Sequence, residues 1–153
     1  MERIIGAAQL RVVIQRVSRA RVRVDGKVVG AIGRGLVVLV GFAAGDSEAQ
    51  MKWMADKLWG LRVFADGEAR MNRSASDVGA ALLIVSQFTL YGDASRGRRP
   101  SFAGAARPEA ARALYDRFVK LCRAGGEVAE GEFGAMMEVE LTNEGPVTLQ
   151  LER

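Results

Sequence analysis

The segment RVVIQRVSRARVRV, residues 11–24, decides the fold class of this 153-residue chain. Its first half is rich in β-branched residues. From Arg19 to Val24 arginines alternate with Ala and Val, which places charged and apolar side chains on opposite faces of a strand. The dipeptide Asp25-Gly26 follows and favours a tight hairpin turn, because a type I′ turn needs positive φ at both central positions. The segment therefore predicts a β-hairpin with one face in the core.

Further strands are predicted on the C-terminal side of this hairpin. Residues 36–42 and 80–88 are long apolar runs, which is typical of central strands covered on both faces. Residues 61–65 predict a shorter strand that ends at an Asp-Gly turn. The tail from 127 to 152 returns to an alternating pattern with period two, so it is also expected to be β-structure.

Two helices complete the predicted fold. Ser47 and Gln50 form a capping box before an apolar stripe at helical spacing that ends at Gly60. Pro108 suits the first turn of a second helix, whose apolar face includes Cys122, expected to be an inert buried thiol. Many strands with two main helices predict an α+β domain with a mixed or antiparallel sheet, or a partly closed barrel.

The composition excludes several kinds of chemistry. The chain has no histidine and one cysteine, so it has no Ser-His-Asp or Cys-His triad, no histidine base, no His or Cys metal cluster and no internal disulfide. We expect neither a metal nor a cofactor. No apolar run reaches the roughly 18 residues of a membrane-spanning helix, and residues 1–10 lack the features of a signal peptide. A cytoplasmic protein without a membrane partner is expected.

Charge is distributed unevenly around a net value of +4. Residues 10–34 contain seven basic residues and one acidic residue, whereas residues 127–153 contain seven glutamates and one arginine. A second basic cluster comprises Arg96, Arg98, Arg99 and Arg107. Basic segments suit a polyanion such as RNA, because phosphate contacts release counterions. They are equally compatible with solvated strand faces, and charge alone leaves both interpretations open.

Two segments contain residues that the predicted strands and helices do not explain. Ser86-Gln87-Phe88-Thr89-Leu90-Tyr91 places polar groups where a buried strand emerges, which suits a site, although a strand end can also satisfy its own backbone. In Thr142-Asn143-Glu144-Gly145-Pro146-Val147-Thr148 a Gly-Pro pair interrupts an alternating pattern. Proline has no N–H for the ladder, and an X-Pro bond is where a cis peptide is accessible. An ordinary hairpin turn is the alternative, and spacing does not separate the two.

Together the two segments resemble the paired signature of the D-aminoacyl-tRNA deacylases. The resemblance runs from Leu10 to the C-terminus. The family usually begins with methionine where this chain has Leu10, so residues 1–9 are expected to be an extension and residues 10–153 a single domain. Four other segments resemble the family in the same order: Arg11–Ser18, Leu61–Phe64, Met71–Asn72 and Arg99–Phe102.

This resemblance implies an esterase that removes D-amino acids, and glycine mischarged on tRNA(Ala), from the 3′-terminal ribose of tRNA. It implies a homodimer in which a cis Gly145-Pro146 motif reaches into the partner subunit's pocket. There the motif, with Asn143, would exclude L side chains and hold the α-amino group of the D form. Arg16 would brace this motif, unless it is simply an exposed strand arginine.

The resemblance also assigns the reacting end of the substrate to the first segment. Ser86, Gln87, Phe88 and Thr89 would line the adenosine and ester pocket, with backbone N–H groups near Phe88 and Thr89 as oxyanion donors. Thr148 is the obvious hydroxyl for a nucleophile, yet no base is evident to activate it or Ser86. The resemblance implies instead that the 2′-hydroxyl of the terminal adenosine assists attack.

Two competing hypotheses remain from the sequence. One is a non-catalytic RNA-binding β-domain, which would need exposed aromatic residues for base stacking, whereas aromatic residues make up 7% of the chain. The other is an oligomerising structural β-domain, which would leave Ser86-Gln87 and Gly145-Pro146 without a role.

Overall fold

The structure, a computed structural model, describes residues 9–153. The N-terminal extension expected over residues 1–9 therefore lies outside the described residues, apart from Gln9. Within residues 9–153, no helix has the length and apolar character needed to cross a membrane.

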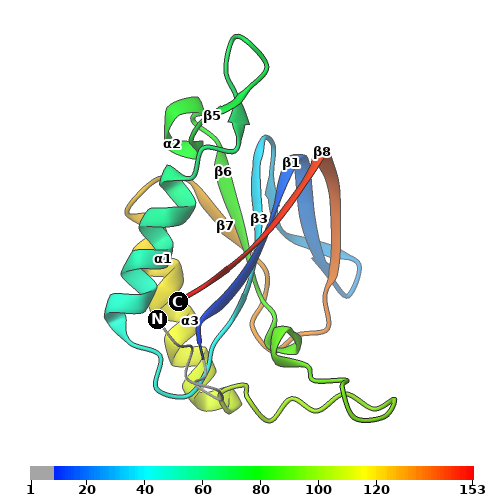
Figure 1. Cartoon of the computed structure of the whole chain (residues 1–153). Coiled ribbons are helices and arrows are strands. Elements are labelled where there is room, and N and C mark those ends of the chain that lie inside the picture. The colour runs from blue at the N-terminus through cyan, green and yellow to red at the C-terminus, as the bar shows by residue number, and fades with distance from the viewer. Residues whose placement is uncertain (1–8) are drawn as a thin grey trace.

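One mixed sheet forms the centre of the molecule (Figure 1). Its strand order is β2-β1-β3-β6-β7, and β8 pairs with the other edge of β1. The strand β1 is antiparallel to β2, β3 and β8, whereas the β3–β6 and β6–β7 pairs are parallel. The strand bounds are Arg11–Val24 for β1, Lys27–Ile32 for β2, Gly35–Gly41 for β3, Ala81–Ser86 for β6, Val128–Glu130 for β7 and Glu138–Glu152 for β8.

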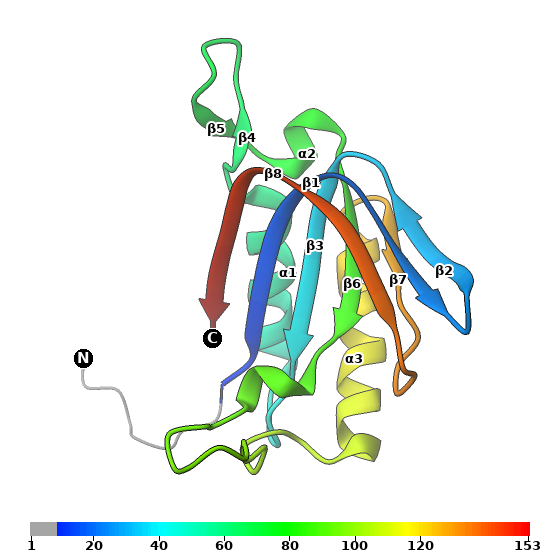
Figure 2. The same cartoon turned by 90° about the vertical axis from the view of Figure 1, so that its right-hand side faces the viewer.

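The long strand β1 bends this sheet into a partly closed barrel. Its first half pairs with β3 and its second half with β2, while β8 follows its other edge along almost the whole length. The sheet consequently wraps around itself, with β2 beside β7 (Figure 2). At this closure a Cβ on Gly30 would lie 2.2 Å from the carbonyl oxygen of Glu130, so only glycine fits. The predicted α+β fold with a barrel-like mixed sheet is confirmed.

Helices α1 (Glu48–Gly60) and α3 (Pro108–Arg123) cover one face of the sheet (Figure 1). The capping box at Ser47 and Gln50 is present, and Pro108 occupies the first turn of α3, as predicted. One hydrophobic core fills the space between these helices and the sheet, and a smaller one fills the barrel interior around Val22 and Leu83. Cys122 is buried, and burial raises the pKa of its thiol to about 12, so it stays protonated.

Three details of the predicted strand and helix pattern were wrong. The strand expected over residues 61–65 is reduced to β4 (Phe64–Ala65), which pairs with an unpredicted β5 (Met71–Arg73). The short helix α2 (Ala75–Val78) was also missed, because four residues are too few to show helical periodicity. The apolar run 80–88 ends as a strand at Ser86, and a 3₁₀ helix, η1 (Phe88–Tyr91), follows it.

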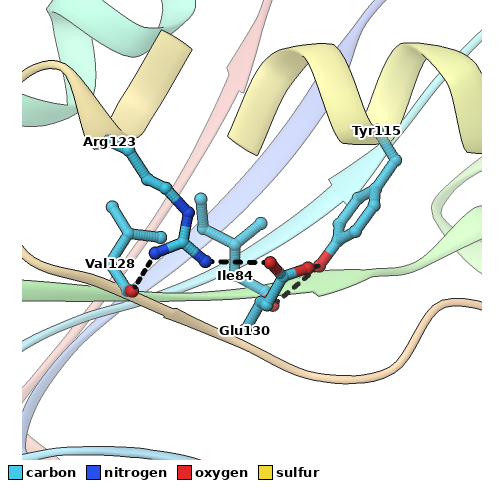
Figure 3. A network of polar contacts seen from close by, with 5 residues as sticks. All are labelled: Ile84, Tyr115, Arg123, Val128 and Glu130. Atoms are coloured by element: carbon cyan, nitrogen blue, oxygen red, sulfur yellow. Dashed lines mark hydrogen bonds and ion pairs between the residues drawn. The ribbon is translucent and has the colours of Figure 1, made fainter. Parts of the chain in front are cut away.

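A polar network fixes α3 to the parallel strands β6 and β7 (Figure 3). The Tyr115 hydroxyl lies 3.0 Å from Glu130 Oε1 and 3.3 Å from the carbonyl oxygen of Ile84. Arg123 donates from Nη2 to Glu130 Oε2 at 2.9 Å and from Nη1 to the carbonyl of Val128 at 2.8 Å. Burial, together with the Glu130 carboxylate, raises the pKa of Tyr115, so its hydroxyl remains a donor. The network thereby holds β6, the strand that carries Ser86, in a fixed position.

Candidate active site

The first half of the candidate site is the segment where β6 passes into η1. The Gln87 N–H donates to the carbonyl of Val40 at 2.7 Å, and the Gln87 side-chain amide donates to the Thr89 hydroxyl. Within residues 9–153, no hydrogen bond uses the Ser86 hydroxyl or the backbone N–H groups of Phe88 and Thr89. The two N–H groups have no partner in this range because they begin a helix. The C-terminal end of β6 therefore presents donors that have no partner within the described residues.

The rings of Phe88 and Phe102 lie beside these donors and form an aromatic wall of the candidate site. The Phe88 side chain is 56% exposed, and its ring packs edge-on against Phe102 with 5.2 Å between ring centroids. On the inner side, Tyr91 donates to the carbonyl of Gly41 at 3.0 Å, and the Arg11 guanidinium lies 4.8 Å from the centre of the Tyr91 ring. No pattern in the sequence indicates a role for Phe102 or for the Arg11–Tyr91 pair, whose members are far apart in the chain.

The second half is a bend in the middle of β8. The strand pairs with β1 on both sides of it, yet residues 144–147 lie opposite Arg16 alone, which is the interruption that the Gly-Pro pair predicts. The Gly145–Pro146 peptide bond is cis, Gly145 has φ of +133°, and both residues are exposed. The bend therefore stands out from the ladder.

Side chains at the two ends of the bend brace it. Asn143 Oδ1 accepts from the Val147 N–H at 2.9 Å, and Asn143 Nδ2 donates to Thr148 Oγ1 at 3.0 Å. Gln15 Nε2 donates to the same hydroxyl at 3.3 Å. Thr148 Oγ1 thus accepts from two amides, and an amide NH₂ group cannot act as a base. Its geometry fits a support for the bend better than a nucleophile.

Arg16 joins the bend to the chain before β4. Its Nε donates to the carbonyl of Glu144 at 3.0 Å and its Nη1 donates to the carbonyl of Val63 at 2.6 Å. The Glu144 carboxylate lies 3.8 Å from Nε, and the Arg16 side chain is only 12% exposed. The planar guanidinium can reach two acceptors in different directions, which a lysine cannot reproduce. The Val63 carbonyl was not identified from sequence, because backbone acceptors leave no sequence signal.

One chain does not bring the two halves together. Ser86 lies opposite Val40 of β3, and Val40 lies opposite Val12 of β1, whereas the bend lies opposite Arg16. The halves are therefore displaced by about 13 Å along the strands and by three strand spacings, about 14 Å, across the sheet. Figure 2 shows the bend of β8 at one end of the sheet and η1 at the other. Ser86, Gln87, Phe88 and Thr89 form one group, and Arg16, Asn143, Gly145, Pro146 and Thr148 form another.

Acidic side chains elsewhere in residues 9–153 do not form a metal site. Across the described part of the chain, no group of three acidic, histidine or cysteine side chains is placed to hold a metal ion. Burial raises the pKa of the Asp46 carboxyl, but its oxygens accept from the Ala43 N–H at 2.8 Å and from Gln50 Nε2 at 3.4 Å. Asp46 is therefore committed to fixing the loop before α1.

Comparisons with known proteins agree over nearly the whole chain. The family model described as D-Tyr-tRNA(Tyr) deacylase matches residues 13–152. A D-aminoacyl-tRNA deacylase of Roseiflexus castenholzii is 57% identical over 144 residues, covering 94% of this chain and 92% of the relative. One of Symbiobacterium thermophilum is 58% identical, covering 94% and 95%.

Two solved structures share the fold. The c-Myc DNA unwinding element binding protein has a TM-score of 0.89 at 38% identity, covering 94% of this chain and 98% of that chain. A probable eukaryotic D-amino acid tRNA deacylase has a TM-score of 0.83 at 22% identity, covering 95% and 100%. The barrel-like arrangement thus recurs in chains of quite different sequence.

Proposed function

The chain belongs to the D-Tyr-tRNA(Tyr) deacylase family, and we propose that it edits charged tRNA by releasing D-amino acids from it. Family membership supports a hydrolase that acts on D-aminoacyl-tRNA, with tRNA as its partner. The observation that carries the proposal is the match over residues 13–152, which includes both halves of the candidate site. Glycine mischarged on tRNA(Ala) belongs to the same proposal, because glycine also lacks an L side chain. A cytoplasmic location is also part of this proposal, because charged tRNA is used in the cytoplasm.

The proposed selection step uses the bend of β8. Gly145 and Pro146, oriented by Asn143 and Arg16, would fill the space that an L side chain requires and leave room for the D form. Rejecting the wrong substrate by exclusion suits an editing enzyme that works among excess L-aminoacyl-tRNA. The exposure of the bend and its bracing by Arg16 support this role.

A homodimer is the second part of this proposal. The two halves of the candidate site lie at opposite ends of one sheet, so a complete site needs the bend of a second copy beside Ser86–Thr89. Within residues 9–153 the 15-residue strand β8 pairs only with β1 and so forms an edge of the sheet, and Val139 and Leu149 on this strand are exposed. A long free edge is a pairing surface, and twofold symmetry would create two equivalent sites.

The proposed chemistry is attack of water on the ester carbonyl, with release of the 3′-oxygen of the terminal adenosine. The N–H groups of Phe88 and Thr89, which have no partner within residues 9–153, would stabilise the negative charge on the carbonyl oxygen. Ser86 and Gln87 would position the ester. No side chain in either half is arranged as a general base, so the neighbouring 2′-hydroxyl of the substrate would assist attack. The protein would then contribute mainly position and selection.

We expect the purified protein to release D-tyrosine from D-Tyr-tRNA with kcat/KM at least about a hundredfold higher than L-tyrosine from L-Tyr-tRNA. The reason is steric exclusion of the L side chain, which acts on binding and on the transition state alike. Release of labelled tyrosine at equal tRNA concentrations measures this ratio, and glycine on tRNA(Ala) should also be released. Equal rates on the two enantiomers would contradict the proposed filter.

Thr148→Ala should retain hydrolysis within about tenfold of the original rate, because it removes an acceptor for two amides and no attacking group. A tRNA that ends in 2′-deoxyadenosine should be a poor substrate for the unaltered enzyme. Rates measured under single-turnover conditions, with tRNA binding measured in parallel, separate chemistry from affinity. A loss of several orders of magnitude in Thr148→Ala with binding intact would identify threonine as the nucleophile instead.

A non-catalytic nucleic-acid-binding domain is the second candidate. The solved relative at 38% identity is named for binding a DNA unwinding element. Under this alternative the protein would bind tRNA and release no amino acid from either enantiomer. The assay with D-Tyr-tRNA therefore separates the two functions directly.

A further inference from the structure

A basic loop adjoins the first half of the candidate site. We define the arginine loop as residues 92–107, which connect η1 to α3. Asp93 and Ser101 pinch its base through two backbone hydrogen bonds of 2.7 and 2.9 Å. A Cβ on Gly92 would lie 3.0 Å from the Phe102 ring, so the base packs closely against the aromatic wall beside Phe88. Beyond this base the loop projects away from the sheet (Figure 1).

The positive charge of this loop is not neutralised within the described chain. The loop's arginines are all exposed, and no hydrogen bond or ion pair within residues 9–153 uses their guanidinium groups. The loop's one carboxylate, Asp93, accepts from the Ser95 N–H at 2.9 Å, and hydrogen bonding from Ser95 lowers the pKa of Asp93. The four arginines are Arg96, Arg98, Arg99 and Arg107.

The strand arginines differ from those of the loop. Arg21 and Arg23 both pair with Glu140 of β8, and Arg11 lies 3.4 Å from Glu152. The acidic C-terminal strand therefore offsets much of the first basic segment of the sequence. In the arginine loop all four guanidinium groups are available for an external anion, whereas in the first cluster Arg11, Arg16, Arg21 and Arg23 form ion pairs with carboxylates and Arg19 forms none within residues 9–153.

We propose that Arg96 and Arg98 of the arginine loop bind phosphates of the tRNA acceptor end that leads to the ester site. This inference rests on the proposed function, because it assigns the surface that holds the same substrate. Exposed guanidinium groups bind phosphate in a bidentate geometry. The residues around them are small or polar, which favours a phosphate backbone over a membrane surface, where apolar anchors are needed.

The dimensions of the loop fit this assignment. Arg96 lies three residues after Asp93 and Arg98 lies three residues before Ser101, so each can extend about 10 Å from the pinched base. Stacked nucleotides rise by about 3.4 Å each along one strand, so this reach covers about three phosphates. The 3′-terminal adenosine would occupy the pocket at Ser86–Thr89 while the preceding phosphates follow the loop.

The test compares two double variants with equal net charge. Arg96→Gln/Arg98→Gln removes the proposed contacts, and Lys52→Gln/Lys120→Gln removes two exposed charges from α1 and α3 on the helical side. Binding of tRNA that carries no amino acid is measured across a range of salt concentrations. The loop variant should bind about tenfold more weakly near 0.1 M salt, and its slope of log affinity against log salt should be shallower by about 1.4 to 1.8. The helix variant should bind within about twofold of the unaltered protein.

Hydrolysis of two substrates then separates phosphate binding from organisation of the pocket. In the loop variant kcat/KM should fall for D-Tyr-tRNA, whereas D-tyrosyl-adenosine, which has no phosphates, should be cleaved at the unaltered rate. Equal losses in both double variants, an unchanged salt slope, or a matching loss on D-tyrosyl-adenosine would each overturn the inference. If the unaltered protein cleaves neither ester, the proposed function fails, while tRNA binding still decides whether the loop holds phosphates.

Discussion

Replacing Gly145 with alanine should lower the release of D-tyrosine from D-Tyr-tRNA by a hundredfold or more. Gly145 has φ of +133°, a conformation that L residues rarely adopt, and an added Cβ would lie 3.0 Å from both Arg16 Nη2 and Val147 Cγ2. The bend must therefore shift, and Arg16 must shift with it. The contacts alone require a shift of a few tenths of an ångström, and relief of the φ strain moves the backbone of the bend further. A positioning group misplaced by about 1 Å can cost about a hundredfold in rate.

The effect on stability should be much smaller than the effect on activity. Strain of this kind costs about 1 to 3 kcal/mol, and the bend is exposed, so it can relax locally. Thermal unfolding by circular dichroism and single-turnover hydrolysis measure the two effects separately. Gly33→Ala is the matched control, because no atom lies within 4 Å of its added Cβ and its φ is not in the positive range. If the Gly145→Ala protein keeps the original rate and D-over-L selectivity, the bend is not part of the site.

Much of the fold could be predicted because long elements repeat a local pattern. The alternation in residues 19–24 follows the pleat of a strand with one face in the core, and the Ser47 capping box marks the start of α1. The errors lie where the element is too short to show a period, or where an apolar residue is exposed instead of buried. β5 and α2 have three and four residues, too few for a period. Phe88 looks like the continuation of a buried strand in sequence, but it is exposed and lies in the candidate site.

The candidate site could be predicted in pieces but not as an arrangement. The motifs identify Ser86–Thr89 and Gly145-Pro146, while their separation depends on the register of β8, β1, β3 and β6, which spacing does not encode. The sequence also does not show which basic residues have a carboxylate partner. The basic segments at residues 10–34 and 96–107 look alike in sequence, yet Glu140 pairs with arginines of the first. Only the folded chain distinguishes neutralised arginines from available ones.

Mixing two defective variants should restore activity if the site forms across a dimer. One chain carries Gly145→Ala and keeps Ser86–Thr89 intact, and the other carries Gln87→Ala with Thr89→Ala and keeps the bend intact. Each homodimer has two damaged sites. A heterodimer has one undamaged site, because its intact Ser86–Thr89 segment meets the intact bend of the other chain. Random reassociation of equal amounts makes half of the dimers mixed, so about a quarter of the original activity should return.

The result separates the dimer proposal from any arrangement within one chain. If both halves acted in the same chain, every chain in the mixture would still carry a defect, and the mixture would be as inactive as its components. The two variants are unfolded and refolded together, and each is also refolded alone to show that refolding itself restores nothing. Heterodimers isolated with two different affinity tags should reach about half of the original activity per dimer. Isolated heterodimers without activity would mean that the exposed bend serves its own chain, despite the roughly 13 Å displacement along the strands between the two halves.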